Sequence, residues 1–372
     1  MNLTNKISIR STLVLTLLGA LAIALLVIVE NSKDFRRQDF YTEKVKAAEL
    51  AARCMIHLKE RFFEDEIAID NINDPNETGI IGQQFSEITS GRGSLPVKLS
   101  TTNPNFAAMI VEQLKRAGVS KGDKVAMCFT GSFPALNIAA MAAVETLGAK
   151  PVLITSVTSS SWGANAPELT WPDMHRELYE KGFVSFMPVA SSIGGNEDVG
   201  RTLSKEGRQL AFDAIERNGL RYINEGNLEG NIARRMDLFQ EDGQKIKAFI
   251  NVGGGIASLG SNANADQLPS GLQTELNAAE IPDKQGVVYE MMKSRVPVIN
   301  LLHINRLMDR YELPRDPVPL PPIGQGKLYE AYKYNLKIVG TATLVFLGLI
   351  LAVMYYDKKQ NKLGTQIIKE HV

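Results

Sequence analysis

The sequence predicts an α/β domain built on a mostly parallel, doubly wound sheet and flanked by one transmembrane helix at each end. Two observations lead to this prediction: short apolar runs alternate with helical stretches, and two long uncharged stretches lie near the chain ends. Alternating strands and helices are typical of parallel sheets, because parallel strands need a crossover connection. The chain of 372 residues is long enough for one large domain or two smaller ones.

The two uncharged stretches are residues 11–29 and 338–356. Each is long enough to cross a bilayer as a helix. No small-x-small cleavage site follows the first stretch, which indicates an uncleaved anchor rather than a signal peptide. Tyr355 and Tyr356 stand where aromatic residues anchor a helix at the membrane interface. Lys and Arg flank the spans on both sides in similar numbers, so charge leaves the orientation open.

The region between the spans begins with a membrane-proximal part. Apolar positions at helical spacing predict a helix over 34–66, and the turn-forming residues of 88–106 predict loops. The whole chain then divides into an anchor (1–30), a membrane-proximal helix and loop segment (31–104), the α/β domain (105–316), a Pro-rich linker (317–337), the second transmembrane helix (338–356) and a basic tail (357–372).

The α/β domain is organised around residues 124–165, which read as strand, turn, helix and strand. Such a βαβ unit has a right-handed connection, and open α/β sheets bind ligands beyond the carboxyl ends of their strands. The predicted strands are 125–129, 151–154, 183–189, 246–251 and 296–301. The predicted helices are 105–117, 134–147, 171–181, 205–218, 228–239 and 284–294.

Composition excludes several classes of function. Lys plus Arg and Asp plus Glu number 41 each, so no net field indicates nucleic acid as a partner. The four histidines, at 57, 175, 303 and 371, lack zinc-ligand spacing. Because no nucleotide or metal motif is present, the sequence leaves any cofactor unknown and predicts no metal. Cys54 and Cys128 form no C-x-x-C pair; Cys128 is expected to be buried, and whether the two pair stays open.

Ser132 is the sharpest catalytic candidate, because it stands at the turn after the first strand. That position is similar to a nucleophile elbow, although T-G-S-F-P departs from the G-x-S-x-G pattern. As a nucleophile, Ser132 would need a base, for which His175 and His303 are candidates. Alternatively, Ser132 is the N-cap of the following helix. It is then either a structural cap alone, or the free N–H groups of that helix would bind an anion or a carboxylate.

The other candidates are small polar or glycine residues in the loops that follow the predicted strands. Trp162 would offer a stacking surface to a ligand, or would only pin its loop by half-burial. The glycines at 253–255 would let the backbone approach a ligand, or would serve a tight turn. The predicted ligand-binding residues are Thr130, Gly131, Ser132, Ser161, Trp162, Asn165, Gly194, Gly195, Asp198, Asn251, Gly253 and Gly254.

Several segments between residues 70 and 325 carry a resemblance to a known family. They are DNINDPNETGIIG, SLPVKLSTTNPNFAAMIVEQLKRAG, GDKVAMCFTGSFPALNIAA, SSWGANAPELTWPDM, VASSIGGNEDVG, KAFINVGGG and PVINLLHINRLMDRYELPRDPVPLPPIG. On these segments the chain resembles the bacterial poly-γ-glutamate system protein family, membrane proteins associated with synthesis and export of that polymer. The resemblance implies a process rather than a reaction, so it transfers no catalytic residue.

These observations lead us to expect a membrane-anchored accessory protein of poly-γ-glutamate synthesis or export. The resemblance implies the bacterial cytoplasmic membrane, with the large domain outside the cytoplasm, and implies the polymer and the synthase subunits as partners. Loops at the strand ends would bind the polymer or the synthase. The alternative is a membrane-tethered serine hydrolase or transferase that acts on γ-glutamyl amide bonds. A third possibility is an assembly scaffold whose loops contact only the synthase.

Overall fold

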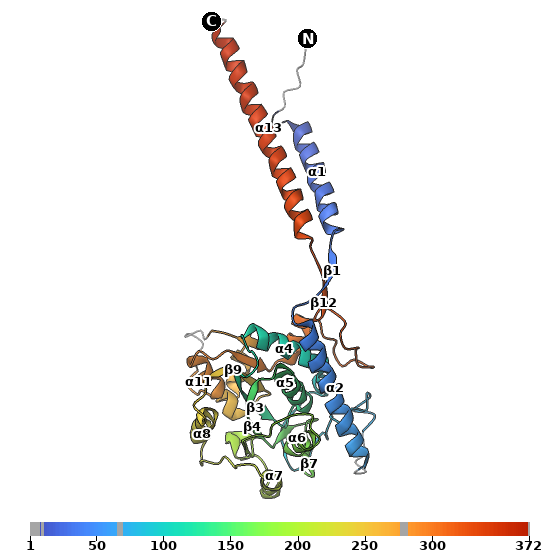
Figure 1. The fold of residues 1–372 in the computed structure, drawn as a ribbon. Helices are drawn as coiled ribbons and strands as arrows, with labels where there is room; N and C mark the ends of the chain where they lie inside the picture. The colour runs from blue at the N-terminus through green and yellow to red at the C-terminus, as the bar shows by residue number, and fades with distance from the viewer. Residues whose placement is uncertain (1–7, 9–10, 65–69, 276–281, 371–372) are drawn as a thin grey trace. The chain divides into compact units, whose positions relative to one another are not determined.

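A computed structural model describes residues 8, 11–64, 70–275 and 282–370 (Figure 1). His371 therefore lies outside the described residues. The chain forms two compact units, which are described separately: Met1–Arg37 with Glu330–Val372, and Gln38–Tyr329. The second unit is wider than the predicted domain over 105–316, because the membrane-proximal helix and part of the Pro-rich segment belong to it.

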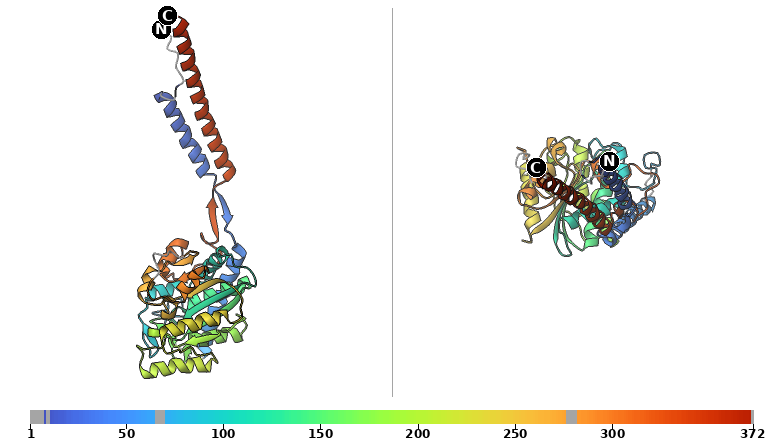
Figure 2. Two further views of the ribbon diagram at one scale, coloured as in Figure 1. Left: turned by 90° about the vertical axis from the view of Figure 1, so that its left-hand side faces the viewer. Right: turned by 90° about the horizontal axis from the view of Figure 1, so that it is seen from above.

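The first unit contains two long helices, α1 (Thr12–Glu30) and α13 (Leu336–Glu370), which lie side by side in Figures 1 and 2. Among the described helices, α1 and the stretch Leu336–Lys362 of α13 are long and apolar enough to cross a membrane. The predicted apolar helices near both chain ends are thus confirmed. The predicted basic tail continues α13 as far as Glu370.

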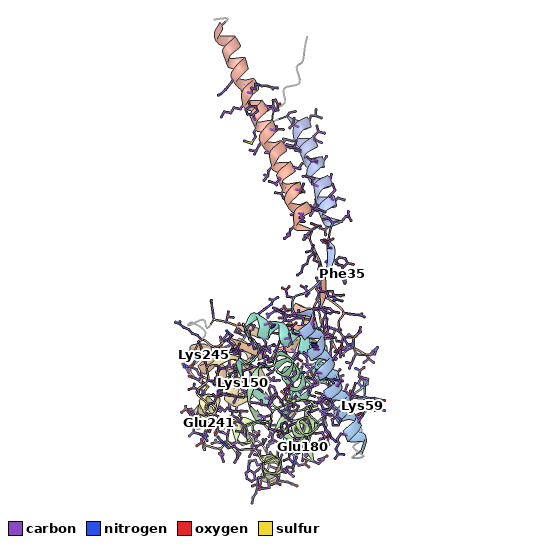
Figure 3. All side chains as sticks on the ribbon, in the orientation of Figure 1. Phe35, Lys59, Lys150, Glu180, Glu241 and Lys245 are labelled. Carbon is purple, nitrogen blue, oxygen red and sulfur yellow. The ribbon has the colours of Figure 1, made fainter. Side chains whose placement is uncertain are left out.

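A two-stranded antiparallel ribbon completes this unit, formed by β1 (Asp34–Arg37) and β12 (Glu330–Lys333). The prediction of helix from residue 34 is wrong at this point, because β12 supplies a pairing partner that is remote in sequence. On one face of the ribbon, exposed Phe35 packs edge-on against Tyr332, with ring centroids 5.3 Å apart (Figure 3 labels Phe35). The helix itself, α2 (Tyr41–Glu64), begins in the second unit.

The second unit is built on a six-stranded sheet in the order β10-β11-β9-β3-β4-β8. Only the edge strand β10 is antiparallel, so the predicted mostly parallel α/β sheet is confirmed. The strands are β3 (Lys124–Thr130), β4 (Lys150–Ser156), β8 (Ala190–Ser192), β9 (Ile246–Val252), β10 (Gly271–Gln273) and β11 (Val298–Leu301).

Side chains of the central strand β3 alternate between two buried clusters. Val125, Met127 and Phe129 belong to one cluster, whereas Ala126 and Cys128 belong to the other. A strand with no polar face must be covered on both sides, which the helices accomplish. These helices are α4 (Asn105–Arg116), α5 (Pro134–Leu147), α6 (Trp171–Glu180), α7 (Lys205–Arg217), α8 (Leu228–Gln240), α11 (Val287–Lys293) and α12 (Ile304–Tyr311).

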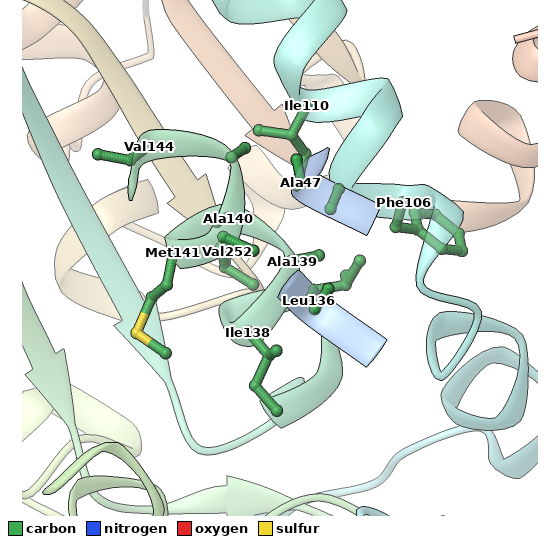
Figure 4. Close-up of a cluster of buried hydrophobic side chains, with 14 of the residues drawn as sticks. Ala47, Phe106, Ile110, Leu136, Ile138, Ala139, Ala140, Met141, Val144 and Val252 are labelled. Atoms are coloured by element: carbon green, nitrogen blue, oxygen red, sulfur yellow. The ribbon is translucent and has the colours of Figure 1, made fainter. Parts of the chain in front are cut away.

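The Ala-rich helix α5 occupies the centre of the larger cluster. Its small side chains let α2 and α4 pack closely against it, as the labelled Ala139 and Ala140 illustrate near Ala47 of α2 and Ile110 of α4 (Figure 4). The helix ends at Gly148, whose φ of 61° is the left-handed conformation that favours glycine at a helix C-terminus. The βαβ unit at 124–165 therefore has the predicted strand, helix and strand, with α5 bounds that match the prediction.

Two other predictions about local structure are wrong. Residues 183–189 do not form a strand. The strand β8 begins only at Ala190, where the backbone starts to pair with β4. The predicted loop over 88–106 contains strand β2 (Thr89–Gly91) and helix α3 (Leu95–Thr101). The strand β2 forms because it pairs with β5 (Ser159–Ser160), which is distant in sequence. A short ribbon of β6 (Asn165–Ala166) and β7 (Leu169–Thr170) follows β5.

Candidate functional site

A cleft of about 510 Å³ lies at the carboxyl ends of the parallel strands. The chain passes from β3 to β4 and β8 on one side, and then returns to β9 and β11 on the other side of β3. Open α/β sheets bind ligands where the strand order reverses in this way. Each of these five strands contributes a residue at or after its end: Thr130, Ser156, Gly194, Gly254 and Leu302.

Helix α3 closes one side of the cleft and carries Lys98. Ser94 precedes the helix and Pro96 lies in its first turn, a combination typical of a helix start. The Lys98 side chain is only 2% exposed. It has no ion-pair partner in the part of the chain that the structure describes. A lysine buried without a carboxylate is uncommon, because desolvation of an ammonium group is costly.

The Lys98 amine meets two serines, one from the β3–α5 loop and one from strand β5. Its Nζ lies 2.9 Å from the hydroxyl oxygen of Ser160 and also donates to the backbone carbonyl of Ser132. The ring of Phe133 lies 4.2 Å from Nζ. Burial lowers the pKa of Lys98 to about 7. Near neutral pH, both the ammonium and the free amine are therefore populated.

The hydroxyl of Ser132 has a backbone partner instead of a titratable one. It accepts a hydrogen bond of 3.0 Å from the N–H of Ser160, which ties the β3–α5 loop to β5. The prediction that Ser132 caps α5 is wrong: the N-cap residue is Phe133, which makes no side-chain cap. The partial positive charge at the start of α5 is therefore left without a capping side chain beside the cleft.

Two glycines allow these loops to approach each other closely. A Cβ atom on Gly163 would lie 2.2 Å from the hydroxyl of Ser159 and 2.8 Å from the carbonyl oxygen of Ser132. A Cβ atom on Gly93 would lie 2.2 Å from the carbonyl oxygen of Ser161. Real Cβ atoms do not approach backbone atoms so closely, so any larger residue would displace the loops that place the two serines.

The opposite side of the cleft carries a buried ion pair. Asp198 is 3% exposed and accepts from Arg235 Nη1 at 2.7 Å and from the Ser192 hydroxyl at 2.7 Å. Arg235 Nη2 also donates to the Ser192 hydroxyl at 2.7 Å. Asp198 lies in the one-turn helix η1 (Asn196–Asp198) with a φ of 64°. Because its charge is balanced by Arg235, Asp198 adds little net negative potential to the cleft.

Charge at the cleft is therefore unbalanced in favour of cations. The charged residues that line it are Arg92, Lys98 and Asp198, and Asp198 is paired. Arg92 is exposed and forms no ion pair with another described residue. No group of three or more potential metal ligands occurs within the described ranges. The cleft thus suits an anionic ligand.

The structure brings together about half of the predicted ligand-binding residues. Those that line the cleft are Thr130, Ser132, Gly194, Gly195, Asp198 and Gly254. Trp162 and Asn165 line a separate pocket of about 370 Å³. Those that line neither are Gly131, Ser161, Asn251 and Gly253. Asn251 is buried and donates to the side chain of Asn300 at 2.9 Å. This hydrogen bond gives the polar Asn251 side chain a structural role in the core.

Neither candidate base lines the cleft. His175 is fully buried, with its Nε2 2.8 Å from the carbonyl oxygen of Phe186, and burial lowers its pKa to about 4. The Nε2 atom of His303 lies 2.6 Å from the carbonyl oxygen of Ala265. Both rings are thus engaged elsewhere. Cys54 and Cys128 are free and buried, so they do not pair, and burial raises the pKa of Cys128 to about 11.

At the centre of the cleft, the sequence analysis missed Lys98, and it left Ser160 out of the predicted ligand-binding residues although its loop was a candidate. The helix-start signal of Ser94 and Pro96 could have revealed α3. No signal in the sequence could have revealed that Lys98 is buried, because the cover comes from loops that are distant along the chain.

Comparisons of the chain with protein-family models, with curated proteins and with solved structures found no match in any of the three.

Proposed function

We propose that this protein is a membrane-anchored accessory component of poly-γ-glutamate synthesis or export, and that its cleft binds the polymer through carboxylate groups. One observation carries the proposal: Lys98 is buried at the cleft without a carboxylate partner among the described residues. The choice of polymer rests on the resemblance of the sequence, and the cationic groups of the cleft support the proposal of an anionic ligand.

The physical argument concerns the missing counter-charge. A buried ammonium is destabilising unless an anion pairs with it. A carboxylate that entered the cleft would pair with Lys98 and would favour its protonated form. The binding of such a ligand would thereby offset part of the free-energy cost of burying the Lys98 ammonium.

Two further features of the cleft support an anionic ligand. Arg92 at the rim has a fixed charge and could hold a second carboxylate of the same chain. The uncapped N-terminus of α5 adds a partial positive charge. A polymer with one carboxylate in each repeat could engage these groups together.

The proposed location is the bacterial cytoplasmic membrane, with Gln38–Tyr329 outside the cytoplasm. The two apolar helices in the Met1–Arg37 and Glu330–Val372 unit support a tether at each end. We expect a reporter that is active only outside the cytoplasm to be active when fused at Gly243, an exposed turn residue. A silent reporter, with a cytoplasmic reporter active at the same position, would reverse the orientation.

Binding is tested with the full chain in detergent and a fluorescent γ-glutamate oligomer. We expect measurable affinity that falls with added salt and falls as pH rises through about 7, where Lys98 loses its proton. Lys98→Met should weaken binding about 10-fold or more, since charge-assisted hydrogen bonds contribute about 1.5–3 kcal/mol.

Lys150→Met is the matched control, because Lys150 is exposed at the start of β4 and does not line the cleft. It should bind as the wild type does. Affinity that is absent, or equal in the Lys98 and Lys150 variants, would contradict the proposed binding function.

A further inference from the structure

The contact between Lys98 and Ser160 has the geometry of a nucleophile and its base. The amine lies 2.9 Å from the hydroxyl oxygen, which is hydrogen-bonding distance for proton transfer. Ser160 is partly exposed and lines the cleft, so a ligand can reach its hydroxyl. Serine nucleophiles activated by lysine are an established alternative to the Ser-His-Asp triad.

The surroundings of the amine fit its neutral form. A free amine has two N–H groups and one lone pair, whereas an ammonium has three donors and no acceptor. Nζ donates to the carbonyl of Ser132 and to the Ser160 hydroxyl. Once the amine has lost one proton, its lone pair can replace the second donor and accept the proton of the Ser160 hydroxyl. The described residues supply no carboxylate that would hold the amine in its charged form.

The backbone of Ser160 is also fixed. Its N–H donates to the Ser132 hydroxyl at 3.0 Å, and β5 pairs with β2. The Ser160 hydroxyl thus extends from a strand whose backbone is fixed by hydrogen bonds. A fixed backbone favours a reproducible geometry of attack.

We propose that Ser160 is a nucleophile and Lys98 its general base, so that the cleft catalyses acyl transfer from an amide or an ester. This inference shares the cleft with the proposed binding function, but it does not require poly-γ-glutamate to be the acyl donor. It also differs from a Ser132 nucleophile, whose hydroxyl is bonded to a backbone N–H.

The reaction proceeds in two balanced halves. Ser160 Oγ attacks the carbonyl carbon while its proton passes to the neutral Lys98 Nζ, and collapse of the tetrahedral intermediate breaks the C–N or C–O bond. The leaving amine or alcohol takes the proton from Lys98, and the acyl group remains as an ester on Ser160. Water or a second amine then attacks this ester, loses a proton to Lys98, and releases the product as Ser160 Oγ regains its proton.

The two uses of Lys98 have opposite pH dependences. Carboxylate binding needs the protonated amine and falls as pH rises, whereas acylation needs the free amine and increases as pH rises through about 7. The other charged groups that line the cleft are Arg92, which is exposed, and Asp198, which is paired with Arg235.

The test uses a fluorophosphonate probe, which reacts covalently with activated serines, on the full chain in detergent. We expect the label on Ser160 by peptide mass spectrometry, at a rate that rises with pH through about 7. Ser160→Ala should abolish labelling, and Lys98→Met should slow it about 100-fold or more, the usual contribution of a general base. Ser185→Ala and Lys150→Met, both at exposed positions away from the cleft, should label at the wild-type rate.

Lys98→Arg separates catalysis from binding, because arginine keeps the charge and cannot act as a base. It should lose labelling, and its binding of the γ-glutamate oligomer should no longer fall as pH rises through about 7. No label on the wild type, a label on another residue, or wild-type labelling in Lys98→Met would each overturn the Ser160–Lys98 pair while leaving the binding function intact. Labelling of Ser160 without oligomer affinity would overturn the binding function alone. Circular dichroism spectra that match the wild type establish that each variant is folded.

Discussion

Two buried charges line the same cleft, and the fold surrounds them in opposite ways. Asp198 is 3% exposed and meets Arg235 and Ser192, each at 2.7 Å. Lys98 is 2% exposed and, among the residues that the structure describes, meets a hydroxyl, a carbonyl and an aromatic ring but no carboxylate. A buried charge whose partner is already present acts as a structural element. A buried charge whose partner is missing is available for a ligand or for proton transfer.

Loss of the structural partner should have the largest effect on stability. Arg235→Met leaves Asp198 buried and unpaired, so we expect the free energy of unfolding to fall by about 3–5 kcal/mol. Denaturation of the full chain in detergent, followed by the fluorescence of buried Trp171, measures this change. The double variant Asp198→Asn/Arg235→Met should recover much of the loss. A fall below about 1 kcal/mol in the single variant would remove the contrast between the two sites.

Loss of the Lys98 amine should act through pH. Its pKa is lowered to about 7 in the folded chain, so between about pH 7 and its ordinary value of 10.5 the unfolded chain binds more protons. The free energy of unfolding of the wild type therefore rises with pH across this window, by up to about 1.4 kcal/mol per pH unit. Lys98→Met has no titrating amine at this position, so its free energy of unfolding lacks this increase.

The expected result is that Lys98→Met has its greatest stability relative to the wild type at pH 6 and loses that advantage steadily towards pH 9. Unfolding midpoints of both proteins over this range provide the measurement. Lys150→Met should follow the wild-type slope, because Lys150 is exposed. Parallel slopes for Lys98→Met and the wild type would show that Lys98 remains charged in the folded protein.

Removal of one hydroxyl from each site should give the smallest effects. Ser192→Ala deletes a group that bonds both members of an ion pair, so we expect a loss of about 1–2 kcal/mol. Ser160→Ala deletes a single contact with an amine that can be neutral, so the loss should be about 0.5–1 kcal/mol. The same denaturation assay compares them, and a larger loss in Ser160→Ala would assign it a structural role.

The scaffold of the cleft could be predicted because its signals are local. Pro134 marks the start of α5 and Gly148 marks its end. The apolar runs around 125–129 and 246–251 have no polar face, which is typical of buried strands. The predicted strand over 183–189 and the predicted loop over 88–106 were wrong, because β8 and β2 depend on partners elsewhere in the chain. Boundaries were therefore predicted well where they depend on backbone preferences and poorly where they depend on pairing.

The centre of the site could not be predicted for a related reason. A lysine in a short polar segment is expected at the surface, because most lysines are solvated. Lys98 is buried because its side chain contacts Ser132, Phe133 and Ser160, which are distant from α3 in the sequence. The position of Ser132 after a strand predicts a candidate nucleophile. In the structure, however, its hydroxyl accepts a hydrogen bond from the backbone N–H of Ser160.

The sequence by itself determined the two apolar helices, the parallel α/β class and the edge of the sheet where a cleft would form. These follow from hydrophobic periodicity and from turn residues, which act over a few neighbours. Only the tertiary structure decided which residues meet at that edge, and which charge has a counter-charge among the described residues and which has none there. Burial and pairing depend on contacts between remote segments, and those contacts turn Lys98 from an ordinary lysine into the residue on which both proposals rest.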